Sequence, residues 1–383
     1  MNGNASLATL RTPSLILDLG VMRRNIAAMC KRAAKRNVTL RPHCKTAKCV
    51  EIASLVNEGQ SGGVTVSTLR EADYFVHNGF NDVTYAVGIV PDKLPAVAAL
   101  QERGAVVSVL TDDPEVASAI GRRAAELNVR FRVFIEIDCG DGRAGVDAGS
   151  EALIEIGRRL HEAAGVEIGG VLTHGGHAYE ATTVEGIRKI AEQERDEIVR
   201  AAGRMRDAGL PCPVVSLGST PTVVHGVDLP GVTEIRPGTF VFFDLMMVAL
   251  GVCDYDEIAL TVLASVIGHR RERGHALIDA GALALSKDPG IRRSGPYGAY
   301  GLIRQTDAAA PWPGLAVADV SQEHGKIVCT EDGAVFPFDA LAVGNRVRVI
   351  PNHACLTAAA HDRYFVVDGG DAIVAEWPRL AGW

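Results

Sequence analysis

The sequence predicts an α/β chain with an N-terminal (β/α)8 TIM-like barrel and a C-terminal, mostly antiparallel β domain. Apolar, β-branched runs alternate with helical patterns from about residue 20 to about residue 240, as expected of parallel strands that are buried on both faces. Seven or eight such units fit a closed barrel better than an open doubly wound sheet, which stays the alternative. After about residue 245 the long helical patterns disappear, and short strands stand between Gly, Pro and Asp turns.

The units of the predicted barrel follow one another without a long linker. A helix over 21–36 leads to a strand over 38–41 and a second helix over 47–57. Gly or Asn closes later helices, because both residues accept the left-handed conformation of a helix C-terminus. Further strands are expected at 63–67, 82–87, 105–110, 130–138, 166–173, 213–217 and 232–236, and helices at 69–78, 92–103, 114–127, 150–164 and 183–207.

The change in the predicted pattern of helices and strands divides the chain into two domains, a barrel over 20–245 and a β domain over 246–383. The apolar run 14–18 fits a strand of either part, so residues 1–19 are an optional addition to the β domain. Strands of the β domain are expected at 260–268, 275–279, 314–321, 326–329, 346–350 and 364–368.

Composition narrows the class of protein. A net charge of −7 argues against a nucleic-acid binder, which normally carries a basic patch. No apolar run approaches the ~20 residues that span a bilayer, so no membrane partner is expected. The N-terminal residues show no secretory signal, and the eight cysteines contain no CxxC pair and no disulfide framework. The expected location is therefore the cytoplasm.

The motif RPHCKT, residues 41–46, lies at the junction between the strand expected at 38–41 and the helix expected at 47–57. Barrel enzymes place their chemistry at the carboxyl ends of their strands. Lys45 in this motif is therefore a candidate Schiff-base lysine. The competing interpretation is an ordinary solvated cation.

Two further strand ends carry candidate groups for an anion or a ring. The loop GST, Gly218, Ser219 and Thr220, offers backbone N–H groups and hydroxyls that can converge on a phosphate, unless it is a plain surface loop. Arg143, within DCGDGRAG, carries a guanidinium that can donate to a ring nitrogen or to a carboxylate. A surface turn with a solvated arginine is the alternative there.

A third strand end, THGGHAY over residues 173–179, carries His174, His177 and Tyr179. Histidines in this position can serve as metal ligands, acid–base groups or phosphate donors. Because no third metal ligand follows at a useful spacing, we interpret these side chains as pocket lining.

The β domain contains the motif PNHACLT, residues 351–357. On an extended segment, residues i and i+2 project to the same side, so His353 and Cys355 can bind one metal ion. An imidazole and a thiolate suit zinc first, with manganese as a second candidate, and two protein ligands leave positions open for water and substrate. A lone HxC pair without a metal is the competing interpretation.

Taken together, these motifs resemble the fold-type III pyridoxal-phosphate enzymes, and within them the D-serine dehydratase and D-threonine aldolase family. The resemblance covers nearly the whole chain, and its pieces appear in the family's order. They are TPS (12–14), RPHCKT (41–46), GRAGV (142–146), GST (218–220) and PNHACLT (351–357).

The resemblance implies roles for individual residues. Lys45 would bind pyridoxal 5'-phosphate as a Schiff base and act as the catalytic base, and Arg143 would face the ring nitrogen. Gly218, Ser219 and Thr220 would hold the phosphate, with His174 and Tyr179 beside the cofactor. His353 and Cys355 would hold a divalent metal. The family is usually dimeric, so the resemblance also implies a homodimer with shared active sites.

The implied activity is that of a lyase on a small D-β-hydroxy amino acid. Cys355 favours D-serine dehydratase, which makes pyruvate and ammonia, because the aldolases tend to carry an aspartate there. The alternatives are a D-threonine aldolase and a D-threo-3-hydroxyaspartate dehydratase, in which His361 or Arg363 would serve a second carboxylate. A non-catalytic pyridoxal-phosphate carrier would lack the β domain, and an alanine racemase would need a second base from it.

Overall fold

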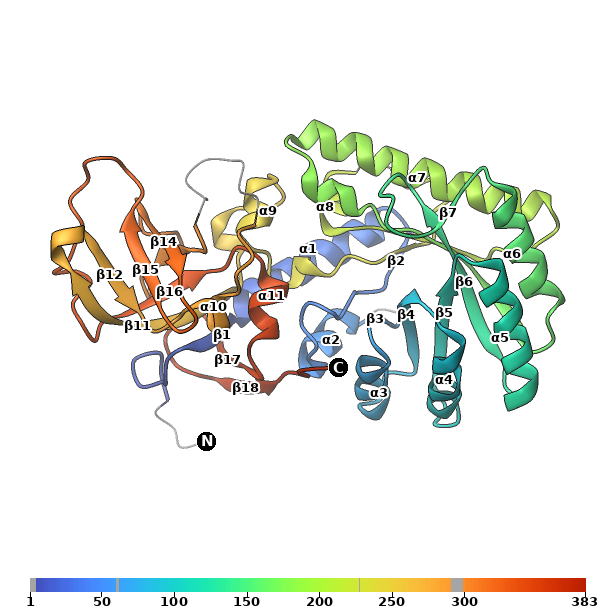
Figure 1. Cartoon of the computed structure of the whole chain (residues 1–383), viewed down its shortest axis with the longest axis horizontal. Coiled ribbons are helices and arrows are strands. Elements are labelled where there is room, and N and C mark those ends of the chain that lie inside the picture. Colours follow the sequence, from blue (N-terminus) through green and yellow to red (C-terminus); the bar gives the residue numbers. More distant parts are fainter. Residues whose placement is uncertain (1–4, 60–61, 227, 291–298) are drawn as a thin grey trace. The chain divides into compact units, whose positions relative to one another are not determined.

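The computed structural model describes residues 5–59, 62–226, 228–290 and 299–383. The chain forms two compact units. We call Met29–Gly238 together with Trp383 the barrel unit, and Met1–Ala28 together with Thr239–Gly382 the β unit. The first is built on parallel strands with helices beside them, and the second mainly on antiparallel strands (Figure 1).

The barrel unit contains a parallel sheet with the order β2-β10-β9-β8-β6-β5-β4-β3. A parallel bridge between His43 and Thr65 joins the two ends of this order, so the strands close into a ring. This arrangement confirms the barrel and excludes the open sheet. The strands are β2 (Thr39–Leu40), β3 (Val64–Val66), β4 (Asp82–Gly88), β5 (Val106–Thr111), β6 (Phe131–Asp138), β8 (Val166–Leu172), β9 (Val214–Leu217) and β10 (Glu234–Ile235), with β7 (Val146–Asp147) paired to β6.

Helices alternate with these strands, as the sequence pattern predicts. Helices α3 and α4 pack against β4 and β5 (Figure 1). The helix predicted from residue 47 begins at Val50, because Lys48 has a positive φ of 46° and Cys49 is extended. The helices are α1 (Leu19–Lys35), α2 (Val50–Asn57), α3 (Leu69–His77), α4 (Leu94–Gln101), α5 (Pro114–Leu127), α6 (Glu151–Glu162), α7 (Val184–Asp207) and α8 (Thr220–His225).

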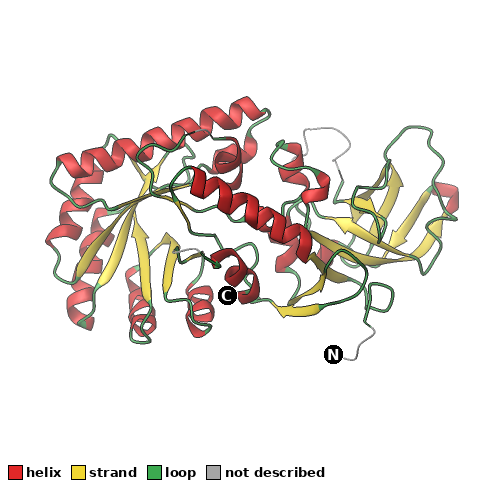
Figure 2. Cartoon of the chain, turned by 180° about the vertical axis from the view of Figure 1, so that it is seen from behind, coloured by secondary structure: helices red, strands yellow, loops and turns green. Residues whose placement is uncertain are grey.

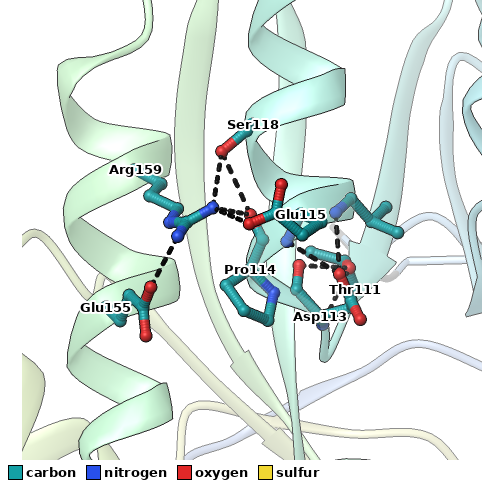
Figure 3. A network of polar contacts seen from close by, with 8 residues as sticks. Thr111, Asp113, Pro114, Glu115, Ser118, Glu155 and Arg159 are labelled. Carbon is teal, nitrogen blue, oxygen red and sulfur yellow. Dashed lines mark hydrogen bonds and ion pairs between the residues drawn. The ribbon is translucent and has the colours of Figure 1, made fainter.

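Helix α5 shows how local sequence sets an element's limits. Asp113 accepts hydrogen bonds from the first-turn N–H groups, Pro114 occupies the first turn, and Asn128 ends the helix at a left-handed φ of 51°. Arg159 of α6 donates to the Pro114 carbonyl and to Glu115, which ties α6 to the start of α5 (Figure 3). This contact helps to hold α5 and α6 side by side.

The β unit contains a second sheet, drawn among the yellow strands of Figure 2. Its order is β12-β15-β14-β13-β16-β11-β1-β17-β18, and β12 also pairs with β11. All pairings except that of β1 with β17 are antiparallel, which confirms the predicted β architecture. Strand β1 (Ser14–Asp18) joins this sheet, whereas the sequence left it open. The other strands are β11 (Leu260–Arg270), β12 (His275–Ile278), β13 (Leu302–Arg304), β14 (Leu315–Val320), β15 (Gly325–Cys329), β16 (Arg346–Ile350), β17 (Arg363–Val367) and β18 (Ala375–Pro378).

Short helices accompany the second sheet, namely α9 (Leu245–Ala249), α10 (Ala282–Leu285) and α11 (Ala354–Ala359). The eight cysteines, all of which lie in the described ranges, are free thiols. Across the part of the chain that the structure describes, every helix is too short or too polar to cross a membrane.

Candidate active site

A pocket of about 380 Å³ opens where the barrel strands end. Its volume lies within the range usual for small-molecule and cofactor sites. Each lining residue stands at or just beyond the carboxyl end of a strand, where barrels place their chemistry. The lining residues are His43, Lys45, Ser67, Ala86, Val87, Gly88, Glu136, Arg143, Ala144, Leu172, His174, Gly218 and Arg236.

The backbone around Lys45 is fixed from both sides of the ring. The His43 N–H donates to the Pro237 carbonyl at 3.0 Å, and the Cys44 N–H donates to the Thr65 carbonyl at 2.8 Å. Lys45 follows directly, and its exposed side chain lines the pocket. The lysine therefore stands on a backbone held at both neighbouring residues, with its side chain lining the pocket.

Arg41 anchors the strand end that precedes Lys45. Its guanidinium bonds to Glu234 at 2.7 Å and to Asp82 at 2.8 Å, so three barrel strands meet at one cation. The two carboxylates raise the pKa of Arg41 against the opposing effect of burial. Removal of one member of such a buried network leaves its partners uncompensated.

The pocket is cationic. Arg143 lines it with a side chain that is 57% exposed, and its Nε lies 3.8 Å from Asp141. Arg236 lies deeper and donates to the Ser216 hydroxyl and the Thr173 carbonyl. Burial lowers the pKa of Arg236 to about 10, so it stays charged at neutral pH. With Lys45, these arginines outnumber the one lining carboxylate, Glu136.

The two histidines in the pocket are neutral near pH 7. Burial lowers the pKa of His174 to about 3, and the charges of Lys45, Arg143 and Arg236 act in the same direction. Burial and the neighbouring Lys45 also lower the pKa of His43. Both imidazoles can thus accept a hydrogen bond at one nitrogen while donating from the other.

The predicted phosphate loop reaches the pocket at Gly218 alone. Gly218 has a φ of +117°, and a Cβ there would lie 2.8 Å from Val223, so the turn requires glycine. Ser219 caps α8 by accepting from the Thr222 N–H. The Thr220 hydroxyl is buried and has no hydrogen-bond partner among the described residues.

Glu194 of α7 ties two pocket loops together from behind. Its Oε1 accepts from the Gly175 N–H at 2.6 Å and from the Gly218 N–H at 3.1 Å. The side chain is completely buried, and burial raises its pKa although the two N–H donors act in the opposite sense. The loops that carry His174 and Gly218 are consequently fixed relative to each other.

Tyr179 lies in the 3-10 turn Gly176–Glu180, half-buried, and is not among the lining residues. Arg236 and Glu136 also line the pocket, and neither was predicted from the sequence. Arg236 ends the strand that the sequence predicted at 232–236, so a cation at a strand's carboxyl end was the available signal.

His353 and Cys355 belong to the β unit. The prediction of an extended segment is wrong: β16 ends at Ile350, His353 occupies the N-cap position of α11, and Cys355 lies in the first turn of that helix. The side chains of His353 and Cys355 are nevertheless hydrogen-bonded to each other. Burial alone would lower the pKa of His353, whereas its hydrogen bonds to Cys355 and Asp288 raise this pKa to about 10. The contact between His353 and Cys355 therefore does not require the extended backbone that was predicted.

Two carboxylates support the His353 region. The Asp288 Oδ2 lies 2.6 Å from His353 Nδ1, and Asp244 accepts from the Ala354 N–H at 2.8 Å. Within the described ranges, no group of three or more His, Cys, Asp or Glu side chains is arranged to hold a metal ion. A metal on His353 and Cys355 would thus keep open coordination positions, as catalytic sites do.

Two family models match the chain. Residues 17–245 match the family described as "Alanine racemase, N-terminal domain", and residues 259–367 match the one described as "Putative serine dehydratase domain". A D-threo-3-hydroxyaspartate dehydratase of Delftia sp. strain HT23 is 43% identical over 99% of both chains. A D-serine dehydratase of Dictyostelium discoideum is 32% identical over 99% of both, and a D-threonine aldolase of Arthrobacter sp. is 28% identical over 95% of this chain and 91% of its own.

Solved structures of named enzymes also resemble this chain. The Delftia enzyme superposes with a TM-score of 0.95 at 42% identity, covering 99% of this chain and all of its own. A cysteine-to-alanine mutant of a D-threo-3-hydroxyaspartate dehydratase, solved in a metal-free form, also gives 0.95, at 41% identity and the same coverage. An alanine racemase of Clostridium difficile 630 gives 0.68 at 13% identity, covering 97% of this chain and 99% of its own, which shows the shared fold.

Proposed function

The chain belongs to the alanine racemase N-terminal domain family, and from that premise we propose that it is a pyridoxal-phosphate- and metal-dependent dehydratase of D-β-hydroxy amino acids. The family is one of pyridoxal-phosphate enzymes, and the named relatives are dehydratases and aldolases, so the chain is a lyase. The observation that carries dehydration is the imidazole–thiol pair of His353 and Cys355 in the β unit.

The barrel pocket fits pyridoxal 5'-phosphate by charge and size. Lys45, Arg143 and Arg236 line the pocket together with a single lining carboxyl group, that of Glu136, so the pocket favours an anion. Lys45 would hold the cofactor covalently, and Arg143 would donate to its ring nitrogen. Gly218 and the unpartnered Thr220 hydroxyl, with Ser219 behind them, would support the phosphate, while His174 and Tyr179 would lie beside the cofactor.

When bound, the cofactor stabilises the carbanion that forms as the α-proton leaves. Lys45 Nζ is the base that takes this proton, because it is the titratable amine in the pocket and stands on a fixed backbone. Neutral His174 and His43 line the pocket without adding positive charge at neutral pH. With Arg143 at the ring nitrogen, Arg236 is the lining cation left to bind a carboxylate or phosphate group.

A divalent metal on His353 and Cys355 would supply Lewis-acid polarisation of the substrate's β-hydroxyl. The donor set, one imidazole and one thiol, suits zinc, with manganese as the second candidate. In D-threo-3-hydroxyaspartate dehydratase, the mutated histidine and cysteine of two solved structures are separated by one residue. His353 and Cys355 have the same separation, which supports their assignment as the metal pair.

We place D-threo-3-hydroxyaspartate first among the substrates and D-serine second. The sequence motifs favoured D-serine, but the relative named for hydroxyaspartate is 43% identical, against 32% for a D-serine dehydratase. In the reaction the Cα–H and Cβ–O bonds break and water leaves. The enamine that remains is hydrolysed to a keto acid and ammonia, which is oxaloacetate for hydroxyaspartate and pyruvate for D-serine.

The test is an assay of the cofactor-loaded protein with D-threo-3-hydroxyaspartate, D-serine and D-threonine, read for keto acid, ammonia, glycine and aldehyde. We expect keto acid and ammonia in equal amounts, with hydroxyaspartate turned over fastest. Chelation or Cys355→Ala should lower kcat/KM by about 100-fold or more while the cofactor stays bound. Glycine and aldehyde in place of keto acid would show an aldolase instead.

We also propose that the barrel, over about residues 20–245, binds the cofactor and that residues 246–383 carry the metal pair. The protein would work in the cytoplasm, where its free thiols stay reduced.

It would form a homodimer in which the partner's β domain completes each active site. Light scattering should then give twice the chain mass of 40.5 kDa, and a monomeric mass with full activity would reject the dimer.

A further inference from the structure

A second cavity, of about 840 Å³, lies entirely within the β unit and has no part in the proposed reaction. Strands β13 and β16, the N-terminus of α1 and two loops form its walls. The lining residues are Asp18, Gly20, Val21, Arg24, Asp256, Arg304, Thr306, Asp307, Ala308, Ala309, Arg348, Asp368, Gly369, Gly370 and Asp371.

Two buried arginines form the base of this cavity. Arg304 of β13 and Arg348 of β16 lie directly opposite each other in the sheet and are 5% and 3% exposed. Arg348 Nε donates to the Thr261 hydroxyl at 2.7 Å, and Arg304 Nη1 reaches the Ala309 carbonyl at 3.4 Å. Arg348 Nη2 and Arg304 Nε are buried and find no acceptor in the described residues.

The positive charge at this base is incompletely compensated. Burial lowers the pKa of Arg348 to about 9, and the charge of Arg304 adds to the effect, yet both arginines stay protonated at neutral pH. Asp18 is the one carboxylate whose charge acts on both. Two guanidiniums against one carboxylate leave a net positive base, which is costly without an anion.

The N-terminus of α1 adds to this positive field. Gly20 and Val21 line the cavity at the start of a helix of 17 residues. Unpaired N–H groups and the helix dipole make such a terminus attractive to anions. Asp18 caps it by accepting from the Val21 N–H at 3.0 Å, so part of its negative charge is already engaged.

The rim of the cavity has the opposite sign. Four of its aspartates are exposed, and in the described part of the chain none of them forms an ion pair, whereas Arg24 is the only exposed cation that lines the cavity. A ligand that is negative at one end and positive at the other would meet complementary charge at both ends, while a bare dianion would be repelled on entry. The four are Asp256, Asp307, Asp368 and Asp371.

We propose that this cavity is a second ligand site for a small zwitterion, whose carboxylate binds between Arg304 and Arg348 and whose ammonium group meets the aspartate rim. A free amino acid has this chemistry. The site is independent of the proposed lyase reaction, because no residue of it lines the barrel pocket.

N,N-Dimethylglycine is the probe, since its tertiary amine cannot form a Schiff base with pyridoxal phosphate. Titration calorimetry on the cofactor-loaded protein should show saturable binding at about one molecule per chain, with the visible cofactor spectrum unchanged. Arg348→Met and Arg304→Met should each weaken binding about tenfold or more. Arg273→Met, an exposed arginine of the same unit, is the control and should leave binding unchanged.

Two further measurements separate a ligand site from a structural role. In buffer without ligand, Arg348→Met should have a Tm equal to or above that of the wild type, because it removes a buried charge that is incompletely compensated. Asp368→Asn together with Asp371→Asn, both at exposed positions, should weaken binding of N,N-dimethylglycine but not of acetate. The rim variant keeps the proposal testable even if an arginine variant fails to fold.

Several results would overturn the proposal. Absence of saturable binding would do so, and so would binding that neither arginine variant weakens. A fall in the ligand-free Tm of Arg348→Met with binding retained would assign the guanidinium a structural role. Acetate or inorganic phosphate binding as tightly as N,N-dimethylglycine would refute the zwitterion, because the rim would then contribute nothing.

Discussion

Lys45 and Lys48 show at the residue scale why position in the fold decides the role of a lysine. Lys48 lies 3.0 Å from the completely buried Glu71, and its ammonium sits over the ring of Trp383. The Lys48 ammonium is therefore already paired with other groups of this chain. Lys45, three residues earlier, forms no ion pair within the described ranges and lines the cationic pocket. Of these two amines, that of Lys45 is the one that lines the pocket, where a ligand would bind.

Asp288 holds His353 in one orientation, which leads to a prediction for metal binding. The carboxylate lies 2.6 Å from His353 Nδ1, so Nε2 is the nitrogen left for a metal. Loss of such a carboxylate partner commonly weakens metal affinity by about 10–100-fold. We expect Asp288→Asn to weaken zinc binding by this factor, measured by competition with a chromophoric chelator.

The control for Asp288→Asn is Asp332→Asn, an exposed position in the same unit. It removes one carboxylate without touching His353, so zinc affinity should stay that of the wild type. Equal affinity in both variants, with both folded, would mean that Asp288 has no part in orienting the histidine.

At the scale of elements, Glu194 makes α7 the support for two loops that line the pocket. One carboxylate oxygen accepts from both Gly175 and Gly218, which follow β8 and β9. Glu194→Ala would leave two buried N–H groups unpaired, at about 1–3 kcal/mol each. We expect a lower free energy of unfolding by denaturant and a weaker affinity for pyridoxal phosphate.

Glu194→Gln is the matched control for this prediction. Its amide oxygen can still accept from both N–H groups, and the raised pKa of Glu194 shows that burial already disfavours the charged form. Stability and cofactor affinity close to the wild type are expected. If Glu194→Gln loses as much as Glu194→Ala, the negative charge rather than the acceptor atom is what the loops need.

The same elements show how far the sequence could predict the site. Strand ends were visible as apolar runs that stop at Gly, His or Arg, so Lys45, Arg143, His174 and Gly218 could be assigned to one edge of the barrel. Local pattern could not reveal Glu194, because its partners lie 19 and 24 residues away along the chain. Nor could it reveal that α11 begins at Ala354, since a segment of six residues carries too little helical periodicity.

At the scale of the whole molecule, alternation of strands and helices predicted the barrel. The loss of long helical patterns after about residue 245, with short strands in their place, predicted the β architecture. The pairing that closes the barrel was out of reach, since His43 and Thr65 are separated by helix α2. In the second sheet β11 and β12 are neighbours along the chain, but the pairing of β11 with β16 joins segments distant in sequence. Strands β13 and β18 were missed because they are only three and four residues long. The cavity above Arg304 and Arg348 requires both strands in register, which no local motif encodes.

Borohydride reduction followed by peptide mapping shows directly whether Lys45 binds pyridoxal phosphate. Reduction makes a lysine–cofactor bond permanent, so mass spectrometry can locate it on the chain. We predict that the cofactor mass is found on Lys45 alone, and that Lys45→Ala carries none and makes no keto acid. Attachment to Lys48 or to any other lysine, or full turnover by Lys45→Ala, would contradict the assignment.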